Sequence, residues 1–230
     1  DQKIDARRQL QSLFATAQLG YNEFVYLDLS ARNDWSSTLA YTSHEKSGFF
    51  YPSVGFSLIF NKLMTLPQWV SLAKIRGAYS MVGNDIPMFI TNPSSHITAG
   101  GEFLASDAAP FKDMEPEMTH SFEAGIEARF LKNRIGLNAT FYKTNTRNQF
   151  FKLPTLSGDK YAYRYVNAGD IQNVGWEISL DAVPLLTNHF KWKTEVNFST
   201  NRNKIISLHE ALKEFLYGPT SPSLIHISEP

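Results

Sequence analysis

Hydrophobic and polar residues alternate strictly in the segment 121–130. Even positions are apolar and odd positions are polar, charged or glycine, which gives Phe122, Ala124, Ile126, Ala128 and Phe130 against Ser121, Glu123, Gly125, Glu127 and Arg129. A period of two predicts a β-strand with one apolar and one polar face. A helix would put Glu123 and Glu127 on the same stripe as Ile126 and Phe130. Because that stripe would mix charge with the buried side, the helical interpretation is rejected.

The same alternation recurs in seven further segments, so the sequence predicts eight strands. These segments cover residues 13–21, 25–32, 53–60, 70–80, 137–141, 174–182 and 190–199. Between 121–130 and 137–141, the pair Lys132 and Asn133 is typical of a tight turn. We therefore expect an all-β protein built from antiparallel strands.

The connections between these strands alternate in length. Short links are expected at 20–23, 61–69, 131–134 and 184–189, and long ones at 34–48, 83–119 and 147–173. A soluble β-sandwich has no reason to keep every long loop at one end. Short turns at one end and long loops at the other are typical of a transmembrane β-barrel.

Strand length and aromatic residues favour the same interpretation. Ten residues rising about 3.3 Å each and tilted by about 40° span roughly 25 Å, the height of the apolar band of such barrels. Aromatic residues recur at the short-turn ends, where rings with an apolar body and a polar edge suit a membrane interface. They are Tyr21, Phe24, Phe60, Trp69, Phe130, Phe190 and Trp192. Capping of a soluble sandwich core is the alternative explanation for these rings.

Composition excludes several classes of protein. Lys plus Arg and Asp plus Glu number 22 each, so no strongly basic surface indicates nucleic acid as a partner. The absence of cysteine excludes disulfide scaffolds, thiol catalysis and cysteine-based metal sites. No apolar run approaches the roughly 18 residues of a membrane helix, but a barrel strand exposes only alternate residues to lipid.

Alternation assigns a predicted environment to each side chain of the strands. Lumen-facing residues are expected at Glu123, Glu127, Arg129, Glu177 and Asp181. Lipid-facing residues are expected at Phe122, Ile126, Trp176, Ile178, Leu180 and Val196. Since the charges on the polar face have mixed signs, we expect mutual neutralisation rather than a dedicated substrate path.

Substrate contact is expected in the long loops, because binding residues usually lie on loops and the barrel wall holds those loops in position. Candidate substrate-binding residues are Phe103, Phe111, Tyr161, Tyr163 and Tyr165. Aromatic faces suit sugar rings, but they equally suit packing against a lid protein or against each other. The alternate spacing of the three tyrosines also fits a strand that extends the wall beyond the membrane.

Catalytic chemistry is not indicated. The six histidines are scattered without metal-ligand spacing, and nucleophile elbows, phosphate loops and dinucleotide fingerprints do not occur. We expect no catalytic residue, no metal and no cofactor, and therefore no enzyme.

Four stretches resemble recurring barrel segments of the SusC/RagA family of TonB-dependent transporters from the outer membrane of Bacteroidota. They are "ARNDWSSTL" (31–39), "KIRGAYSMVGND" (74–85), "MEPEMTHSFEAGIEARFLKNRIGLNATFYKTNTRNQFF" (114–151) and "NAGDIQNVGWEISL" (167–180), in the order in which the family has them. The resemblance covers roughly residues 12–208. It implies a location in the outer membrane of a Gram-negative, Bacteroidota-like cell.

The resemblance also implies partners and a larger parent protein. It implies a 22-stranded barrel around a plug domain, a SusD-like lipoprotein as a lid, energy from TonB, and import of an oligosaccharide or a peptide. This chain matches only part of that pattern, with about eight strands and neither a plug nor a TonB-contacting segment. The transport function therefore describes the parent protein.

The expected organisation has three parts. Residues 1–208 form a partial TonB-dependent receptor barrel, 209–222 begin an extracellular loop, and 223–230 are a non-native tail, with a genuine loop tail as the alternative. A rival hypothesis from another class is a secreted, β-rich glycan-binding module that uses the loop tyrosines. Partition distinguishes the two, since the module dissolves without detergent whereas a wall with two unpaired edges does not.

Overall fold

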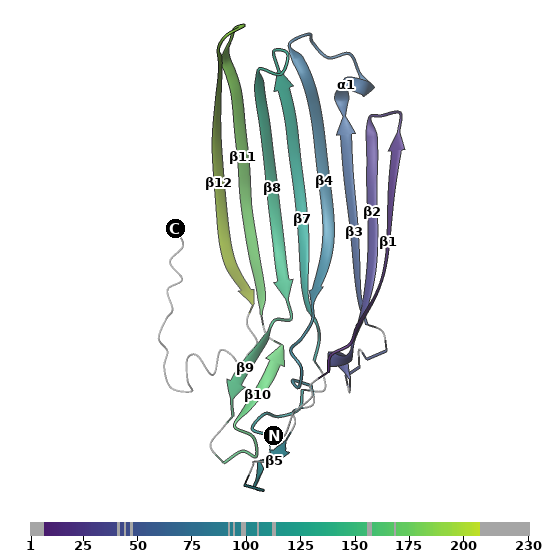
Figure 1. The fold of residues 1–230 in the computed structure, drawn as a ribbon, viewed down its shortest axis with the longest axis vertical. Helices are drawn as coiled ribbons and strands as arrows, with labels where there is room; N and C mark the ends of the chain where they lie inside the picture. The colour runs from purple at the N-terminus through teal and green to yellow at the C-terminus, as the bar shows by residue number, and fades with distance from the viewer. Residues whose placement is uncertain are drawn as a thin grey trace.

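Eight long strands form one antiparallel sheet in the computed structural model (Figure 1). The structure describes residues 7–40, 42–43, 45–46, 48–91, 93, 95–97, 100–104, 106–111, 114–155, 158–167 and 169–207. In order across the sheet the strands are β1 (Leu10–Tyr21), β2 (Val25–Ser36), β3 (Phe49–Ile59), β4 (Val70–Asn84), β7 (Glu117–Phe130), β8 (Ile135–Arg147), β11 (Asp170–Leu186) and β12 (Lys191–Ser207). The predicted all-β class and the eight predicted strands are confirmed, although all eight strands are longer than predicted. The segments expected at 209–222 and 223–230 lie outside the described residues.

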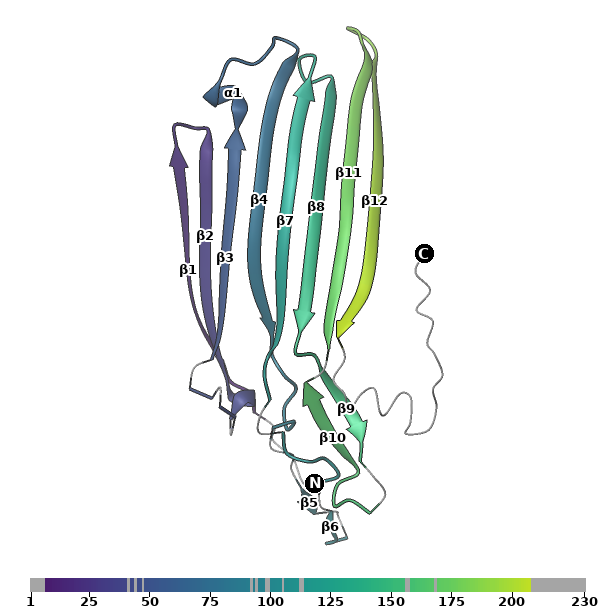
Figure 2. The same ribbon diagram turned by 180° about the vertical axis from the view of Figure 1, so that it is seen from behind.

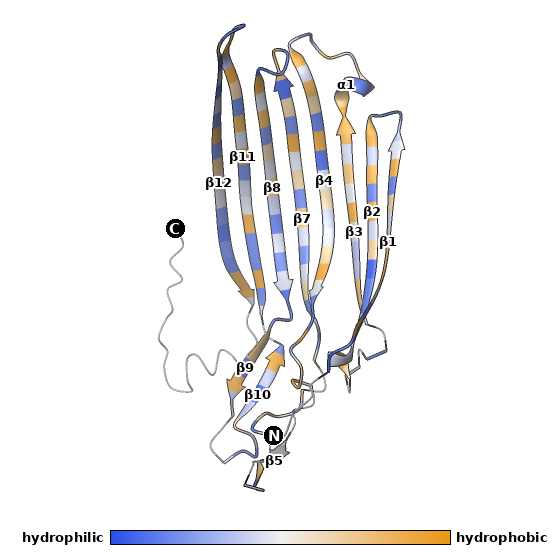
Figure 3. Cartoon of the chain, in the orientation of Figure 1, coloured by the Kyte–Doolittle hydropathy of each residue, from blue (hydrophilic) through white to orange (hydrophobic). Residues whose placement is uncertain are grey.

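The strand registers give the sheet two chemically different faces. One row runs across five neighbouring strands and consists of Ile75, Ile126, Ala139, Ile178 and Phe198, each paired with the next. The next row has its side chains on the opposite face and consists of Arg76, Gly125, Thr140, Glu177 and Ser199. Because successive side chains of a strand point to opposite faces, the alternation seen in the sequence becomes an apolar face and a polar face. Figure 3 shows this alternation as bands along the strands.

Short turns lie at one end of the sheet and long connections at the other (Figure 2). The turn between β1 and β2 places Asn22 and Glu23 at positive φ, and Phe24 N donates to Tyr21 O at 3.1 Å. The turn between β7 and β8 places residues 131–133 at positive φ, and Arg134 N donates to Phe130 O at 2.9 Å. Asparagine tolerates this left-handed region better than most residues, which explains the turn predicted at Lys132 and Asn133.

Smaller elements accompany the sheet at both ends. A single helical turn, α1 (Phe60–Leu63), lies in the connection from β3 to β4. The long connections contain η1 (Ser37–Leu39), β5 (His96–Ile97), β6 (Phe103–Leu104), β9 (Phe150–Pro154) and β10 (Tyr163–Asn167). β9 and β10 pair with each other as a separate two-stranded sheet and do not join the wall.

The buried core lies among the long connections and at the adjoining start of β3, away from the middle of the sheet. Among the described residues, one buried cluster contains Leu39, Phe49, Ile86, Ile90 and Met114. Large apolar side chains of the sheet remain exposed, for example Ile126 at 46%, Trp176 at 50% and Val196 at 57%. In the described part of the chain, no helix is long and apolar enough to cross a membrane.

Candidate functional site

The polar face of the sheet is organised around glycines that make room for long side chains. Arg76 lies across β7, where a Cβ added to Gly125 would stand 2.7 Å from Arg76 Nε. From there Arg76 Nη2 donates to Thr140 Oγ1 at 2.7 Å and to Asn138 Oδ1 at 3.3 Å, both on β8. One arginine thus bridges three strands, and the glycine between them makes this possible.

A second glycine supports an ion-pair cluster nearer the short turns. Arg129 lies 3.7 Å from Glu127 Oε1 and 3.7 Å from Asp181 Oδ2. Asp181 occupies the space that a side chain at Gly136 would need. Because all three charged groups are partly exposed, the pairs contribute little to stability. Arg129 offsets one of the two carboxylate charges, so the expected mutual neutralisation is partial in this cluster.

A shallow polar groove of about 350 Å³ lies beside Arg76 on strands β8, β11 and β12. Its polar lining consists of Arg76, Asn138, Thr140, Glu177, Ser179, Asn197 and Ser199. Glu177 is exposed within the groove, opposite Thr140 on one side and Ser199 on the other. Hydroxyl, amide and charged groups facing one open surface can bind polar solutes by many weak hydrogen bonds.

The five side chains predicted to face the lumen share the polar face. Glu123, Glu127 and Arg129 lie on this face of β7, and Glu177 and Asp181 lie on the same face of β11. Asp181 shares a row with Arg129 through Gly136, whereas Glu177 shares a row with Gly125 through Thr140. Among them, the structure brings only Glu127, Arg129 and Asp181 together. Which solvent the face meets remains a prediction.

The six side chains predicted to face lipid share the apolar face. Phe122 and Ile126 belong to β7, Trp176, Ile178 and Leu180 to β11, and Val196 to β12, where it pairs with Leu180. Trp176 packs on Phe141 of β8 with a ring-centroid distance of 5.1 Å. Soluble proteins carry hydrophobic surface residues singly, whereas here exposed Ile, Leu, Val and aromatic residues form one continuous face. An apolar surface of this extent indicates contact with a membrane or another protein.

Aromatic residues gather at the short-turn end, as the sequence predicted. Trp69 stacks on Phe130 at 5.6 Å, and Tyr21 meets Phe24 edge-on at 5.5 Å. Beside them, Lys62 Nζ on α1 donates to Glu23 Oε2 at 2.6 Å. This hydrogen bond lowers the pKa of Glu23 below its ordinary value, so the contact persists at neutral pH and is lost as the pH falls through that lowered pKa.

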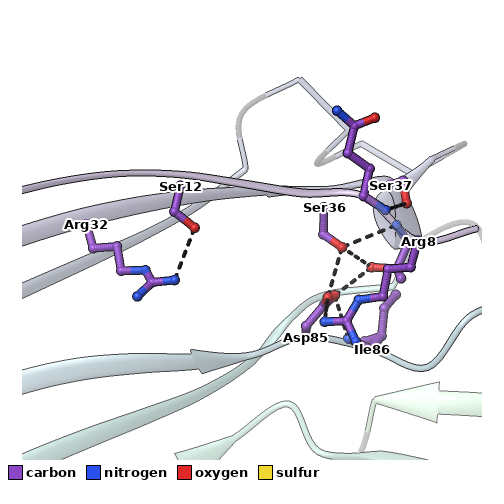
Figure 4. A network of polar contacts seen from close by, with 9 residues as sticks. Arg8, Ser12, Arg32, Ser36, Ser37, Asp85 and Ile86 are labelled. Carbon is purple, nitrogen blue, oxygen red and sulfur yellow. Dashed lines mark hydrogen bonds and ion pairs between the residues drawn. The ribbon is translucent and has the colours of Figure 1, made fainter.

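At the opposite end, Asp85 joins the loops (Figure 4). Its carboxylate accepts from Ser36 Oγ at 2.9 Å, from Thr38 Oγ1 at 2.5 Å and from Ile86 N at 2.8 Å, and it pairs with Arg8. The alternation of apolar and polar residues does not identify Asp85 as a functional residue. Its position directly after a strand could have indicated this role, because an aspartate there can accept hydrogen bonds from the following loop.

Replacing Asp85 by Ala is expected to loosen the loop end without disturbing the wall. Each partly buried donor left without an acceptor costs about 1–3 kcal/mol, so hydrogen-exchange protection of residues 36–40 and 85–91 should fall by about tenfold or more. Asp107→Ala is the control, since Asp107 is exposed in the same long connection. Equal protection in both variants would show that Asp85 does not hold the loops.

The five loop aromatics predicted to bind substrate do not converge on one site. Phe111 and Tyr165 pack against the buried cluster of Leu39, Phe49, Ile86, Ile90 and Met114. Tyr163 lies edge-on to Tyr165 at 5.9 Å, and Lys152 Nζ stands 3.5 Å from the Tyr163 ring centre. Tyr161 lies beside Lys160 Nζ at 5.3 Å, whereas Phe103 is 66% exposed. Packing therefore occupies Phe111 and Tyr165, and among the five candidates Phe103 is the one whose side chain is mostly exposed.

Metal-binding and catalytic arrangements are not evident in the described residues. No group of three or more His, Cys, Asp or Glu side chains there could hold a metal ion. The candidate site is therefore a two-faced wall with organised loops at one end.

This arrangement is found in a known family of proteins. The family model described as "TonB dependent receptor-like, beta-barrel" matches residues 1–210. The chain belongs to this family. The TonB-dependent receptors lie in the outer membrane, so this chain is an outer-membrane protein whose sheet is part of a barrel wall. The family comprises receptors and transporters and not enzymes. The rival secreted binding module is therefore excluded.

Individual TonB-dependent receptors show how much of such a protein's length the chain covers. TonB-dependent receptor P39 of Formosa agariphila is 25% identical over 208 residues, which cover 86% of this chain and 20% of that protein. TonB-dependent receptor SusC of Bacteroides thetaiotaomicron is 25% identical over 227 residues, which cover 89% of this chain and 22% of that protein. The chain thus spans about a fifth of the length of these relatives.

Solved structures of TonB-dependent receptors share the fold. The RagAB peptide importer in its open-open state matches with a TM-score of 0.75 at 24% identity, over 86% of this chain and 22% of that one. The siderophore receptor PirA of Pseudomonas aeruginosa matches with a TM-score of 0.55 at 16% identity, over 86% of this chain and 35% of that one.

Proposed function

We propose that this chain forms about a third of the wall of a SusC/RagA-type transporter that imports an oligosaccharide or a peptide across the outer membrane. The observation that carries the proposal is the pair of opposite faces, with Ile126 and its row on one side and Arg76 and its row on the other. The apolar face meets lipid and the polar face lines the lumen. In a closed barrel, each face then meets a suitable environment, hydrocarbon for the apolar face and water for the polar face.

The polar groove supports passage of a polar solute and not tight binding to the wall. Its hydroxyl and amide groups offer many weak contacts, and Arg129 offsets part of the negative charge of Glu127 and Asp181. Selective binding is therefore assigned to the long loops. There Phe103 is free to contact cargo or lid, while Asp85 and the buried cluster keep the loop bases fixed.

The proposal includes two protein partners. Transporters of the SusC/RagA type work with TonB and with a SusD-like lipoprotein, and we assign both partners to the parent of this chain. TonB would act on parts of the parent other than these strands. The SusD-like lipoprotein would cover the loop end, where the loops carry the exposed Met88, Phe89 and Phe103.

Deletion of the gene tests this function. The deletion strain should lose growth on one class of nutrient in a panel of oligosaccharides and peptides, and the intact gene should restore it. Restored uptake should stop when the proton gradient that drives TonB is collapsed. Unchanged growth on every nutrient, or uptake that does not depend on the gradient, would contradict the proposal.

A further inference from the structure

The apolar face changes character near the loop end. Along the row through Val54, Tyr79 and Phe122, the next three positions are Lys143, Val174 and Arg202. One row further out, the positions of β8, β11 and β12 are Asn145, Gln172 and Lys204. The face that is apolar at Ala139, Ile178 and Phe198 therefore becomes basic within a few residues.

Three cations of this region form a compact group, here called the basic patch: Lys143, Arg202 and Lys204. Lys143 and Arg202 stand on either side of Val174, and Lys204 follows Arg202 on the same face of β12. All three side chains are exposed. Within the described part of the chain, none of the three has a carboxylate partner.

Asp170, two positions from Gln172 on the same face of β11, is already engaged by other side chains. Asp170 accepts from Arg147 Nε at 3.3 Å and from Asn145 Nδ2 at 3.0 Å. Gln172 Nε2 in turn donates to Asn145 Oδ1 at 3.1 Å. On the polar face, by contrast, Arg129 lies close to two carboxylates. The basic patch is thus a positive surface that the described residues do not neutralise.

The height of the basic patch places it at the edge of the hydrocarbon. Lys143 follows Ile135, the first residue of β8, by eight positions. At about 3.4 Å per residue and a tilt of about 40°, this is roughly 20 Å along the membrane normal, near the top of an apolar band of about 25 Å. Lysine and arginine at this depth extend their charged ends to the head groups.

We propose that Lys143, Arg202 and Lys204 bind the phosphate group of a phosphorylated glycolipid in the outer leaflet of the membrane. The inference rests on the proposed orientation, in which the apolar face meets lipid and the long loops are extracellular. Val174 and Ile178 then contact the acyl chains while the three cations contact the head group. Clusters of basic residues beside an apolar surface have the chemistry that recognises anionic lipids.

The test compares lipid binding by the full-length transporter and by a K143Q/R202Q/K204Q variant. Native mass spectrometry in detergent, with monophosphorylated lipid A as the probe, gives the apparent dissociation constant. The substitutions are expected to weaken binding by roughly a hundredfold, because each cation near an anionic surface contributes about fivefold. A K132Q/K191Q/K193Q variant removes the same charge at the short-turn end and should bind as the wild type does.

Two further probes separate head-group recognition from other causes. Dephosphorylated lipid A should bind the wild type as weakly as it binds the patch variant, and inorganic phosphate should not compete at the same concentration. Equal binding of the lipid to wild type and patch variant, or equal binding of the dephosphorylated lipid to the wild type, would overturn the proposal. Effective competition by inorganic phosphate would assign the patch to a free anion and overturn it as well. Nutrient uptake is not measured, so the transport proposal stands or falls separately.

Discussion

Replacing Ile126 by Arg should lower the free energy of unfolding in lipid by about 2–4 kcal/mol, because an arginine on the lipid face near the bilayer midplane is strongly unfavourable. Ile126 lies in the centre of the apolar rows, between Ile75 on β4 and Ala139 on β8. Its side chain is 46% exposed, so the larger residue fits sterically and the penalty reports the surrounding solvent. Denaturant titration of the transporter reconstituted in vesicles measures the effect.

The matched control introduces the same residue on the opposite face. Ala78 lies on the polar face of β4, directly opposite Glu123 of β7. Ala78→Arg should change the free energy of unfolding by less than about 1 kcal/mol, since the new charge meets water and a carboxylate. Glu127→Gln should likewise have little effect. If Ile126→Arg and Ala78→Arg were equally destabilising, the assignment of the two faces would be wrong.

Replacing Gly175 by Ala is the second change with a large expected effect. A Cβ at Gly175 would overlap the carbonyl oxygen of Thr200 on β12 and the hydroxyl of Tyr142 on β8. Because the carbonyl belongs to a paired strand, it cannot move without disturbing the pairing of β11 with β12. Overpacking of this kind costs about 1–3 kcal/mol, which thermal unfolding in detergent should detect.

Gly77→Ala is the control for Gly175→Ala. A Cβ at Gly77 would have the carbonyl oxygen of Glu123 as its nearest neighbour, at 3.7 Å, an ordinary contact. Alanine also loses less conformational freedom on folding than glycine does, so this change should be neutral or slightly stabilising. A Gly175→Ala variant as stable as Gly77→Ala would show that Tyr142 and β12 yield more easily than the structure indicates.

The wall was predictable from the sequence because one face must be uniformly apolar. Because of that requirement, apolar and polar residues alternate in segments such as 121–130 and 174–182. An alternation that continues over about ten residues is long enough to predict a strand. The outer ends of the strands were missed. At Lys143 and Arg202 the apolar face already carries charge, so the alternation that identifies the strand stops before the strand does.

The loop end was less predictable because its contacts join residues far apart in sequence. Asp85 accepts hydrogen bonds from Ser36 and Thr38, and no local sequence pattern predicts these contacts. The loop tyrosines were recognised as candidates from their type alone. Their spacing predicted the strand that contains Tyr163 and Tyr165, but this strand pairs with β9 and does not extend the wall. Whether Phe103, Phe111, Tyr161, Tyr163 or Tyr165 contacts substrate remains a prediction.

Site-directed spin labelling in the reconstituted transporter tests the central claim most directly. The chain contains no cysteine, so labels can be attached at single introduced positions within it. Labels replacing Ile126, Ile178 and Val196 should collide with oxygen dissolved in the bilayer and be shielded from a water-soluble nickel chelate. Labels replacing Asn138 and Ser179 on the polar face should show the reverse. Water accessibility at Ile126, Ile178 and Val196 would contradict a wall with lipid on its apolar side and an aqueous lumen on the other.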